Sequence, residues 1–314
     1  MSKILTLTLN PALDVTTAVE RLEPHVKLRC ESPTREPGGG GINVSRMIRE
    51  LGGESCAFLA AGGKIGEHLC QLTEAAGVPI HSFPAPGMTR ETLQVVERES
   101  DTQYRFVMPG PRWNEDDAGK AEAEIGRIIA RAGYGWVVAS GSLPPGMPAD
   151  FFARVARQAD KAGARFVLDS SGEALLRGIE APVSLVKPDR QEIADLAAGL
   201  GGSAGSLEAT AREVVRRGTV NAMIYTRGAE GAVLITEEEV VRWRPPQVEV
   251  KSLTGAGDAF LAAVIVALSR GEDFSTATRW GVAAAAATAT SPGTALASRD
   301  EVKRRFSEVT PAET

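Results

Sequence analysis

Residues 136–171 read WVVASGSLPPGMPADFFARVARQADKAGARFVLDSS, and this stretch decides the fold class. Two short apolar runs, 136–140 and 165–169, flank a segment at 149–162 whose apolar residues recur at helical spacing. A strand, a helix and a second strand in this order form a βαβ unit. In such a unit the two strands run parallel and the helix covers one face of their sheet.

The same alternation of strand and helix extends through most of the chain. Short apolar strands are predicted at 4–8, 55–61, 221–226 and 232–236, and amphipathic helices at 41–53, 67–78, 115–132, 206–217 and 275–290. We therefore predict a single α/β domain over residues 1–314, with three αβα layers around a mostly parallel central sheet.

Two segments, about 15–35 and 88–110, depart from this pattern. They alternate polar and apolar residues and are interrupted by prolines, which indicates exposed antiparallel strands. A turn at 99–101 separates two alternating runs in the second segment. We expect the two segments to form one small β-sheet that stands off the main body as a lid, with apolar residues such as Val95 and Phe106 facing outward.

Composition excludes several classes of function. The net charge of −5 and the absence of a basic block argue against a nucleic-acid partner. The apolar runs are shorter than the roughly 20 residues of a membrane span, and the first residues read as a strand rather than a signal peptide. Three cysteines without C-x-x-C spacing fit a reducing compartment, so we expect a cytoplasmic protein with no membrane partner.

Three glycine-rich stretches are candidate ligand sites, because loops at the carboxyl ends of parallel strands bind ligands. They are EPGGGGINVSR at 36–46, VVASGSLPPG at 137–146 and TGAGDAF at 254–260. Taken alone, the first is also compatible with a flexible turn and the second with a strand stop. No G-x-x-x-x-G-K-[ST] phosphate loop occurs, and the first run does not directly follow the first strand, as a dinucleotide fingerprint should.

The third stretch combines glycines with an acidic residue at the start of an apolar helix. Free backbone N–H groups of Gly255, Ala256 and Gly257 at a helix start would form an anion site. Asp258 is either a helix cap, a role that stabilises by about 1 kcal/mol, or a base beside a transferring phosphoryl group.

The motifs together carry a family resemblance. In chain order they are Asp14 after the first strand, EPGGGGINVSR, YRFVMPG, GSLPPG, DSSGEAL, LVKPDRQE, TRGAEG and TGAGDAF. This set resembles the ribokinase-like (PfkB) family of carbohydrate kinases from Ile4 to about Gly293. Gly40 stands where 1-phosphofructokinases and tagatose-6-phosphate kinases of the family commonly have lysine, which favours the members that act on fructose 6-phosphate.

The resemblance implies a set of roles around phosphoryl transfer from ATP. Asp258 matches the catalytic base, so that it is expected to be both cap and base, and Gly255, Ala256 and Gly257 match the anion hole. The positions matching the ATP site are Lys187, Asp189, Thr226, Arg227, Gly228 and Gly231. Glu192 and Asp189 match the residues that govern Mg²⁺ through water, with Asp189 in place of the family's asparagine.

The resemblance also implies a sugar site and a monovalent-cation site. The positions matching the sugar-phosphate site are Asp14, Lys27, Gly39, Gly40, Asn43, Arg90, Arg105 and Ser142. Ser252, Thr254, Ser291 and Gly293 match a K⁺ site, although Ala295 replaces an arginine of the nearest relatives.

The expected protein is therefore an ATP- and Mg²⁺-dependent kinase that phosphorylates the 1-hydroxyl of D-fructose 6-phosphate to give fructose 1,6-bisphosphate. Tagatose-6-phosphate kinase and 1-phosphofructokinase activity are the alternatives within the family. A non-catalytic sugar-phosphate-binding regulator and a nicotinamide-dependent dehydrogenase are alternatives from other classes. The intact TGAGD argues against the regulator and the misplaced glycine run against the dehydrogenase. A homodimer through the lid sheets is expected, because an unpaired sheet edge favours pairing.

Overall fold

The computed structural model describes residues 2–201, 206–291, 293 and 295–312. The strands of its main sheet are β1 (Ile4–Thr8), β4 (Ser55–Ala61), β5 (Ile80–Pro84), β8 (Trp136–Ser140), β9 (Arg165–Asp169), β10 (Leu185–Val186), β11 (Ala222–Thr226), β12 (Ala232–Thr236), β13 (Val240–Arg244) and β14 (Thr310–Pro311). Their spatial order is β14-β13-β12-β11-β10-β9-β8-β1-β4-β5. The strands from β5 to β11 run parallel, and β12, β13 and β14 continue the sheet antiparallel.

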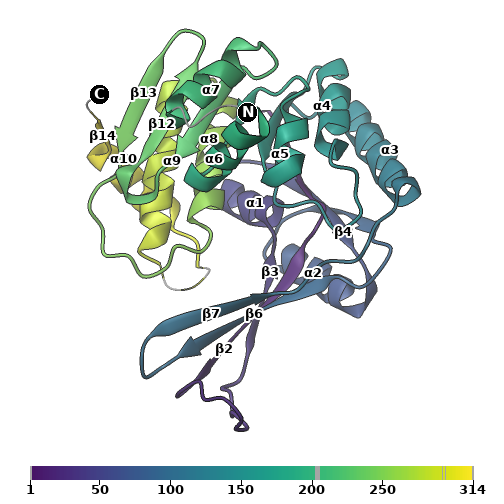
Figure 1. Ribbon diagram of the computed structural model, residues 1–314, viewed down its shortest axis with the longest axis vertical. Helices are drawn as coiled ribbons and strands as arrows, with labels where there is room; N and C mark the ends of the chain where they lie inside the picture. The colour runs from purple at the N-terminus through teal and green to yellow at the C-terminus, as the bar shows by residue number, and fades with distance from the viewer. Residues whose placement is uncertain (1, 202–205, 292, 294, 313–314) are drawn as a thin grey trace.

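Two helical layers enclose the main sheet (Figure 1). One layer holds α3 (Glu115–Ala132), α4 (Phe151–Lys161), α5 (Gly172–Gly178), α6 (Arg190–Gly199) and α7 (Leu207–Arg216). The other holds α1 (Gly40–Glu50), α2 (Gly63–Ala75), α8 (Ala256–Ser269), α9 (Phe274–Ala289) and α10 (Arg299–Glu308). The fold class expected from the sequence, an αβα sandwich with a smaller second sheet, is confirmed.

The buried strands explain why both layers are needed. Leu5 and Leu7 of β1 pack toward the α3–α7 layer, whereas Ile4 packs toward the α1–α8 layer, and all three are fully buried. Burying one such side chain stabilises the fold by about 1.5–3 kcal/mol, so a strand that is apolar on both faces requires helices on both. The α8 helix is apolar all round and lies between α1 and α9, with every residue from 259 to 269 buried.

The second sheet protrudes from the body (Figure 1) and has the order β3-β2-β6-β7. Its strands are β2 (Ala12–Val19), β3 (Thr34–Gly38), β6 (Arg90–Glu97) and β7 (Thr102–Val107). Two expectations about it are wrong. The central pair β2–β6 is parallel rather than antiparallel, and residues 20–33 form no strand.

Burial within the second sheet also differs from the expectation for its outward residues. Val95 is 6% exposed, because β6 lies between β2 and β7, whereas Phe106 on the edge strand β7 is 51% exposed. The turn expected at 99–101 joins β6 and β7, and Asp101 there has a left-handed φ of 52°.

The helices predicted from periodicity are present, with ends that differ by a few residues, but several short elements were not predicted. These are β5, α5, α6, α10, β14 and the 3₁₀ turn η1 (Gly228–Glu230). Each is short or begins at a polar cap, so its hydrophobic period is too brief to recognise. Within the part of the chain that the structure describes, no helix is long and apolar enough to span a bilayer.

Candidate active site

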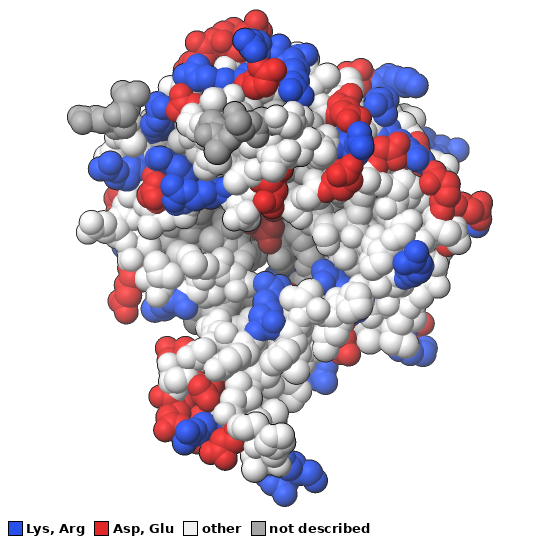
Figure 2. All heavy atoms as spheres, in the orientation of Figure 1, with Lys and Arg blue, Asp and Glu red and all other residues white. Residues whose placement is uncertain are grey.

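The main cavity lies where the carboxyl ends of the parallel strands face the second sheet. It has a volume of about 310 Å³ and is lined by the ends of β8 and β9, the first residues of α1 and α8, and all four strands of the second sheet. Figure 2 shows a hollow between the body and the second sheet, with acidic side chains inside and basic side chains along its lower edge. Open α/β sheets bind their ligands at this edge.

The glycines at 38–41 are required by close packing. Gly39 has a φ of 126°, which side-chain-bearing residues rarely adopt. A Cβ at Gly40 would lie 2.2 Å from Oγ of Ser140, and one at Gly38 would lie 2.3 Å from Oδ2 of Asp14. The run joins β3 directly to α1, so the interpretation as a flexible turn is wrong and the backbone is held against the cavity.

Asp258 lies in the first turn of α8, but it does not cap the helix. The N-cap is Gly255, whose left-handed φ of 78° explains the glycine, and no side-chain capping hydrogen bond is present at this helix start. Instead, Nδ2 of Asn43 donates a hydrogen bond of 2.9 Å to Oδ2 of Asp258. The expected capping role is wrong, because residue 258 lies inside the helix and its carboxylate points across to α1.

The surroundings of Asp258 raise its pKa to about 7. Burial is the main cause and the negative charge of Asp169 the second, while the Asn43 amide and the charges of Lys187 and Arg105 act in the opposite direction. A carboxyl group with a pKa near neutrality is suited to accept a proton at physiological pH. The electrostatics therefore agree with a general base.

Asp169, at the end of β9, was not predicted as a site residue from the sequence, although it lines the cavity. Its Oδ1 lies 2.8 Å from Nζ of Lys187, and Oγ of Ser140 donates to its Oδ2 at 3.0 Å. Lys187 is only 6% exposed, so it is not a solvated surface charge. A Cβ placed at Gly257 would lie 3.9 Å from its Nζ, and this ammonium group therefore lies beside the glycine turn that begins α8.

The opposite wall carries the polar residues of the second sheet. Arg90 donates from Nε and Nη2 to the carbonyl of Asn10, at 3.2 and 3.1 Å, and Arg105 also lines the cavity. Burial raises the pKa of Asp14, whereas Arg105, a hydrogen bond from Thr92 and Arg90 lower it. A phosphate bound between two arginines would meet charge-assisted donors here.

Of two further residues expected at the sugar site, Ser142 lies at the cavity and Lys27 does not. Ser142 lines the cavity, and its Oγ accepts a hydrogen bond of 3.1 Å from Nδ2 of Asn10. Lys27 is exposed in the loop after β2 and is not among the residues that line the cavity, so the single chain does not bring it to the site.

The comparisons agree with this geometry. The description "pfkB family carbohydrate kinase" matches residues 8–301 of the chain. The chain belongs to this family of carbohydrate kinases. It is 40% identical over 304 residues to the ATP-dependent 6-phosphofructokinase isozyme 2 of Mycobacterium tuberculosis, covering 97% of this chain and 89% of the relative.

The Escherichia coli enzyme of the same description is similar in sequence and in structure. It is 38% identical over 307 residues, covering 98% of both chains. A crystal structure of phosphofructokinase-2 from E. coli in complex with fructose-6-phosphate superposes with a TM-score of 0.88 at 36% identity, covering 98% of this chain and 99% of that one. A crystal structure of the same enzyme in complex with potassium gives 0.91 at 37% identity, with the same coverage.

In a kinase of this family the acidic residues beside Lys187 are candidates for Mg²⁺. Glu192 lines the cavity, and its pKa is raised to about 6, mainly by burial. Among the described residues no group of three or more acidic, histidine or cysteine side chains forms a complete metal cage. Two carboxylates, Asp169 and Glu192, at one cavity nevertheless fit a Mg²⁺ ion that keeps most of its water.

Asp189 has a structural role at the start of α6. It is the N-cap of α6, where its Oδ1 accepts hydrogen bonds of 2.8 Å from the backbone N–H groups of Gln191 and Glu192. The Glu192 carboxylate in turn accepts from the Asp189 N–H at 2.8 Å, completing a capping box. Asp189 thus fixes Glu192 at the cavity, but it does not line the cavity itself.

The four other residues expected to bind the nucleotide lie beyond the cavity, at and just after the end of β11. Thr226 ends β11, and Arg227 precedes η1 and forms an ion pair of 3.6 Å with Glu230. Gly228 and Gly231 have left-handed φ values of 59° and 94°, and a Cβ at Gly231 would collide with the carbonyl of Trp243. The glycines therefore set a tight turn at the carboxyl edge of the sheet.

The four residues expected for K⁺ lie in the loops before α8 and after α9. Oγ of Ser252 accepts a hydrogen bond of 3.2 Å from the backbone N–H of Thr254, and Thr254 lines the cavity. Ser291 and Gly293 lie just after α9, whereas positions 292 and 294 are outside the described residues.

Arg46 is a further cavity residue that was not predicted from the sequence. Its Nη2 lies 3.6 Å from Oε1 of Glu36, so that it links α1 to β3 of the second sheet. Its place three residues after Asn43 in EPGGGGINVSR was the available signal, because residues three apart share one face of a helix.

Proposed function

We propose that the protein transfers the γ-phosphoryl group of ATP to the 1-hydroxyl of D-fructose 6-phosphate, forming fructose 1,6-bisphosphate and ADP. The observation that carries the proposal is a buried carboxylate with a pKa near 7, Asp258, opposite a wall that holds Arg90 and Arg105. The similarity to two enzymes described as 6-phosphofructokinase isozyme 2 supports this substrate.

Asp258 accepts the proton of the attacking hydroxyl. The sugar O1 forms a bond to the γ-phosphorus while the bond from that phosphorus to the β–γ bridging oxygen breaks, and the electron pair leaves with ADP. The backbone N–H groups of Gly255, Ala256 and Gly257 and the Lys187 ammonium stabilise the negative charge on the transferring group. Asn43 holds the carboxylate in position through its 2.9 Å hydrogen bond.

The second sheet supplies recognition of the sugar phosphate. Arg90 and Arg105 bind the 6-phosphate, and Asp14 accepts hydrogen bonds from sugar hydroxyls. Closure of this sheet over the cavity as a lid excludes water and thereby protects ATP from hydrolysis.

Metal ions complete the proposal. Mg²⁺, held through water by Glu192 and Asp169, would neutralise charge on the ATP phosphates. K⁺ would bind near Ser252, Thr254, Ser291 and Gly293, and the potassium complex of the E. coli enzyme supports this assignment.

The active protein is proposed to be a cytoplasmic homodimer joined through the second sheets. The exposed apolar residues Tyr104, Phe106, Val107 and Met108 gather on and beside β7, which supports contact with another chain. Such a contact would also let Lys27 approach a sugar site from a neighbouring chain. Phe106→Glu should then produce monomers in light scattering, and a wild-type protein that is already monomeric at assay concentration would exclude the dimer.

A coupled ADP-release assay with a panel of sugars tests the activity. Fructose 6-phosphate should give the highest kcat/KM, and free fructose should be at least about tenfold poorer because it lacks the arginine–phosphate contact. Tagatose 6-phosphate should retain partial activity, and fructose 1-phosphate should be poor because its phosphate occupies the attacking carbon. If fructose 1-phosphate is the best substrate, the protein is a 1-phosphofructokinase; if no sugar releases ADP, the non-catalytic regulator is correct.

A further inference from the structure

A second pocket lies at the opposite ends of the two helices that build the active site. This distal pocket has a volume of about 130 Å³, and its lining includes Leu51, Val266, Arg270, Trp280, Arg299 and Lys303. Arg270 directly follows α8, twelve residues after Asp258, which is about 18 Å along a helix. The distal pocket is therefore separate from the active site and has no part in the chemistry proposed above.

The two arginines of the distal pocket converge on one turn. A Cβ at Gly52 would lie 3.2 Å from Nη1 of Arg299 and 4.0 Å from Nη2 of Arg270, which places both guanidinium groups beside the same residue. Both residues are exposed, yet partial burial and the charge of Arg299 lower the pKa of Arg270, while the charge of Glu272 acts in the opposite direction. Two like charges held this close repel each other, and an anion between them would relieve the repulsion.

Their surroundings do not supply that anion. Among the described residues, no carboxylate lies within ion-pair distance of Arg270 or Arg299. Arg270 donates one hydrogen bond, of 2.9 Å, to the carbonyl of Leu51. Glu272 is the acidic residue of the pocket lining, and Lys303 is partly offset by Asp300 at 3.5 Å. The residues that line the pocket thus include three cations and one carboxylate, and the Glu50 carboxylate lies outside the lining, where it accepts a hydrogen bond of 3.3 Å from the backbone N–H of Arg299.

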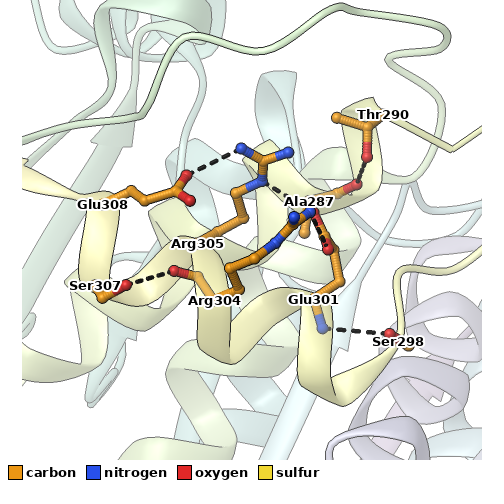
Figure 3. Close-up of polar contacts among 8 residues, drawn as sticks. All are labelled: Ala287, Thr290, Ser298, Glu301, Arg304, Arg305, Ser307 and Glu308. Carbon is orange, nitrogen blue, oxygen red and sulfur yellow. Dashed lines mark hydrogen bonds and ion pairs between the residues drawn. The ribbon is translucent and has the colours of Figure 1, made fainter.

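The other arginines of α10 form ion pairs with carboxylates of the same helix (Figure 3). Arg304 pairs with Glu301, and Arg305 pairs with both Glu301 and Glu308. Arg299 lies at the first position of the same helix, where a cation opposes the helix dipole. Neither an ion pair nor the helix dipole therefore accounts for the guanidinium group of Arg299.

The remaining walls are apolar. Val266, Ala263 and Ala267 on α8 are nearly fully buried, and Leu51 and Trp280 complete the apolar surface. A volume of this size holds about four water molecules at roughly 30 Å³ each, which is space for one phosphate and a few carbon atoms. Arginine is the side chain best suited to bind such a phosphate, because its planar fork donates two hydrogen bonds at once.

We propose that the distal pocket binds a small phosphomonoester, with its phosphoryl group between Arg270 and Arg299 and its short carbon chain against Leu51 and Trp280. The bound molecule would connect the ends of α1 and α8 to α9 and α10.

Fluorine NMR of the full-length protein labelled with 5-fluorotryptophan tests this site directly, because Trp280 lines it. The chain has four tryptophans, and a Trp280→Phe variant assigns the signal. Glycerol 3-phosphate should shift the Trp280 resonance saturably, whereas sodium chloride at the same ionic strength should not. Arg299→Ala should weaken this binding at least tenfold and Arg299→Lys less, while Arg131→Ala, an exposed arginine of α3, should leave it unchanged.

Two further measurements distinguish binding in the distal pocket from binding in the active site and from simple attraction of anions. The Trp280 shift should persist in Arg90→Ala, because the active site is not the source of the signal. The proposal is overturned if the shift does not saturate, if Arg299→Ala binds as the wild type does, or if malonate binds as tightly as glycerol 3-phosphate. The first two results would leave the arginines as helix-end charges, and the third would make the pocket a carboxylate site.

Discussion

The two walls of the main cavity differ in how firmly their functional groups are held. On the body wall, Asp258, Lys187 and Asp169 are linked to each other or to Asn43 and Ser140 within packed strands and helices. On the wall of the second sheet, β7 is exposed along its whole length, and Arg105 is exposed with it. The rigid wall suits chemistry, which depends on alignment, and the exposed wall suits recognition, which can tolerate motion.

The largest effect is expected on the body wall. Asp258→Asn keeps an oxygen that can accept the hydrogen bond from Asn43 but removes the proton acceptor. We expect kcat to fall by about 2–4 orders of magnitude, the usual range for loss of a general base. Steady-state assays with fructose 6-phosphate measure the loss, and circular dichroism controls for folding. Unchanged turnover would mean that the body wall only positions substrates.

The second sheet should affect selectivity more than chemistry. Arg90→Ala removes a guanidinium group from the proposed phosphate site, so the preference for fructose 6-phosphate over free fructose should fall by about tenfold or more. The kcat with saturating fructose 6-phosphate should change much less. Arg112→Ala, an arginine outside the cavity lining, is the matched control. A variant that loses kcat and keeps its selectivity would reverse the division of roles between the two walls.

The difference between the walls also explains what the sequence could predict. The main sheet followed from strands such as 136–140 and 165–169, because burial on both faces makes their apolar pattern strong. The two segments of the second sheet were recognised, although residues 20–33 form no strand. The parallel β2–β6 pairing was not predicted, because no local pattern specifies which of two half-exposed strands will meet.

Among the site residues, glycines and Asp258 were recognisable from a helix start after a glycine run. Asp169 was not, because an acidic residue at a strand end has no distinctive neighbours in sequence, and its importance comes from Lys187 eighteen residues later. The capping role given to Asp258 was wrong for a related reason. The choice of Gly255 as N-cap depends on a left-handed backbone conformation that the sequence allows but does not require.

Asp169 should set the pH dependence of the reaction. Its negative charge is the second cause of the raised pKa of Asp258. Asp169→Asn should therefore move the acid limb of the kcat/KM profile to lower pH, by about 0.5–1 unit. Ser140→Ala removes the hydrogen bond to Asp169 but no charge, and should leave the limb in place. An acid limb that stays at the wild-type pH in Asp169→Asn would show that burial alone sets the pKa of Asp258.

The smallest expected effect concerns stability. Because the folded-state pKa of Asp258, about 7, lies above the ordinary 3.8, the folded protein binds a proton more tightly than the unfolded chain between these values. This contribution to stability is present at low pH and is lost as pH rises through about 7. Asp258→Asn should thus be more stable than the wild type at pH 8, by about 1–2 kcal/mol or 2–4 °C in Tm, and the difference should shrink toward pH 5.5.

Glu192 and Asp14 also have raised pKa values, but they are present in both proteins and cancel in the comparison. Thermal unfolding at both pH values measures the difference. A Tm difference that does not depend on pH would mean that the wild-type carboxylate is ionised at little cost, and that the body wall is more open to water than its hydrogen bonds suggest.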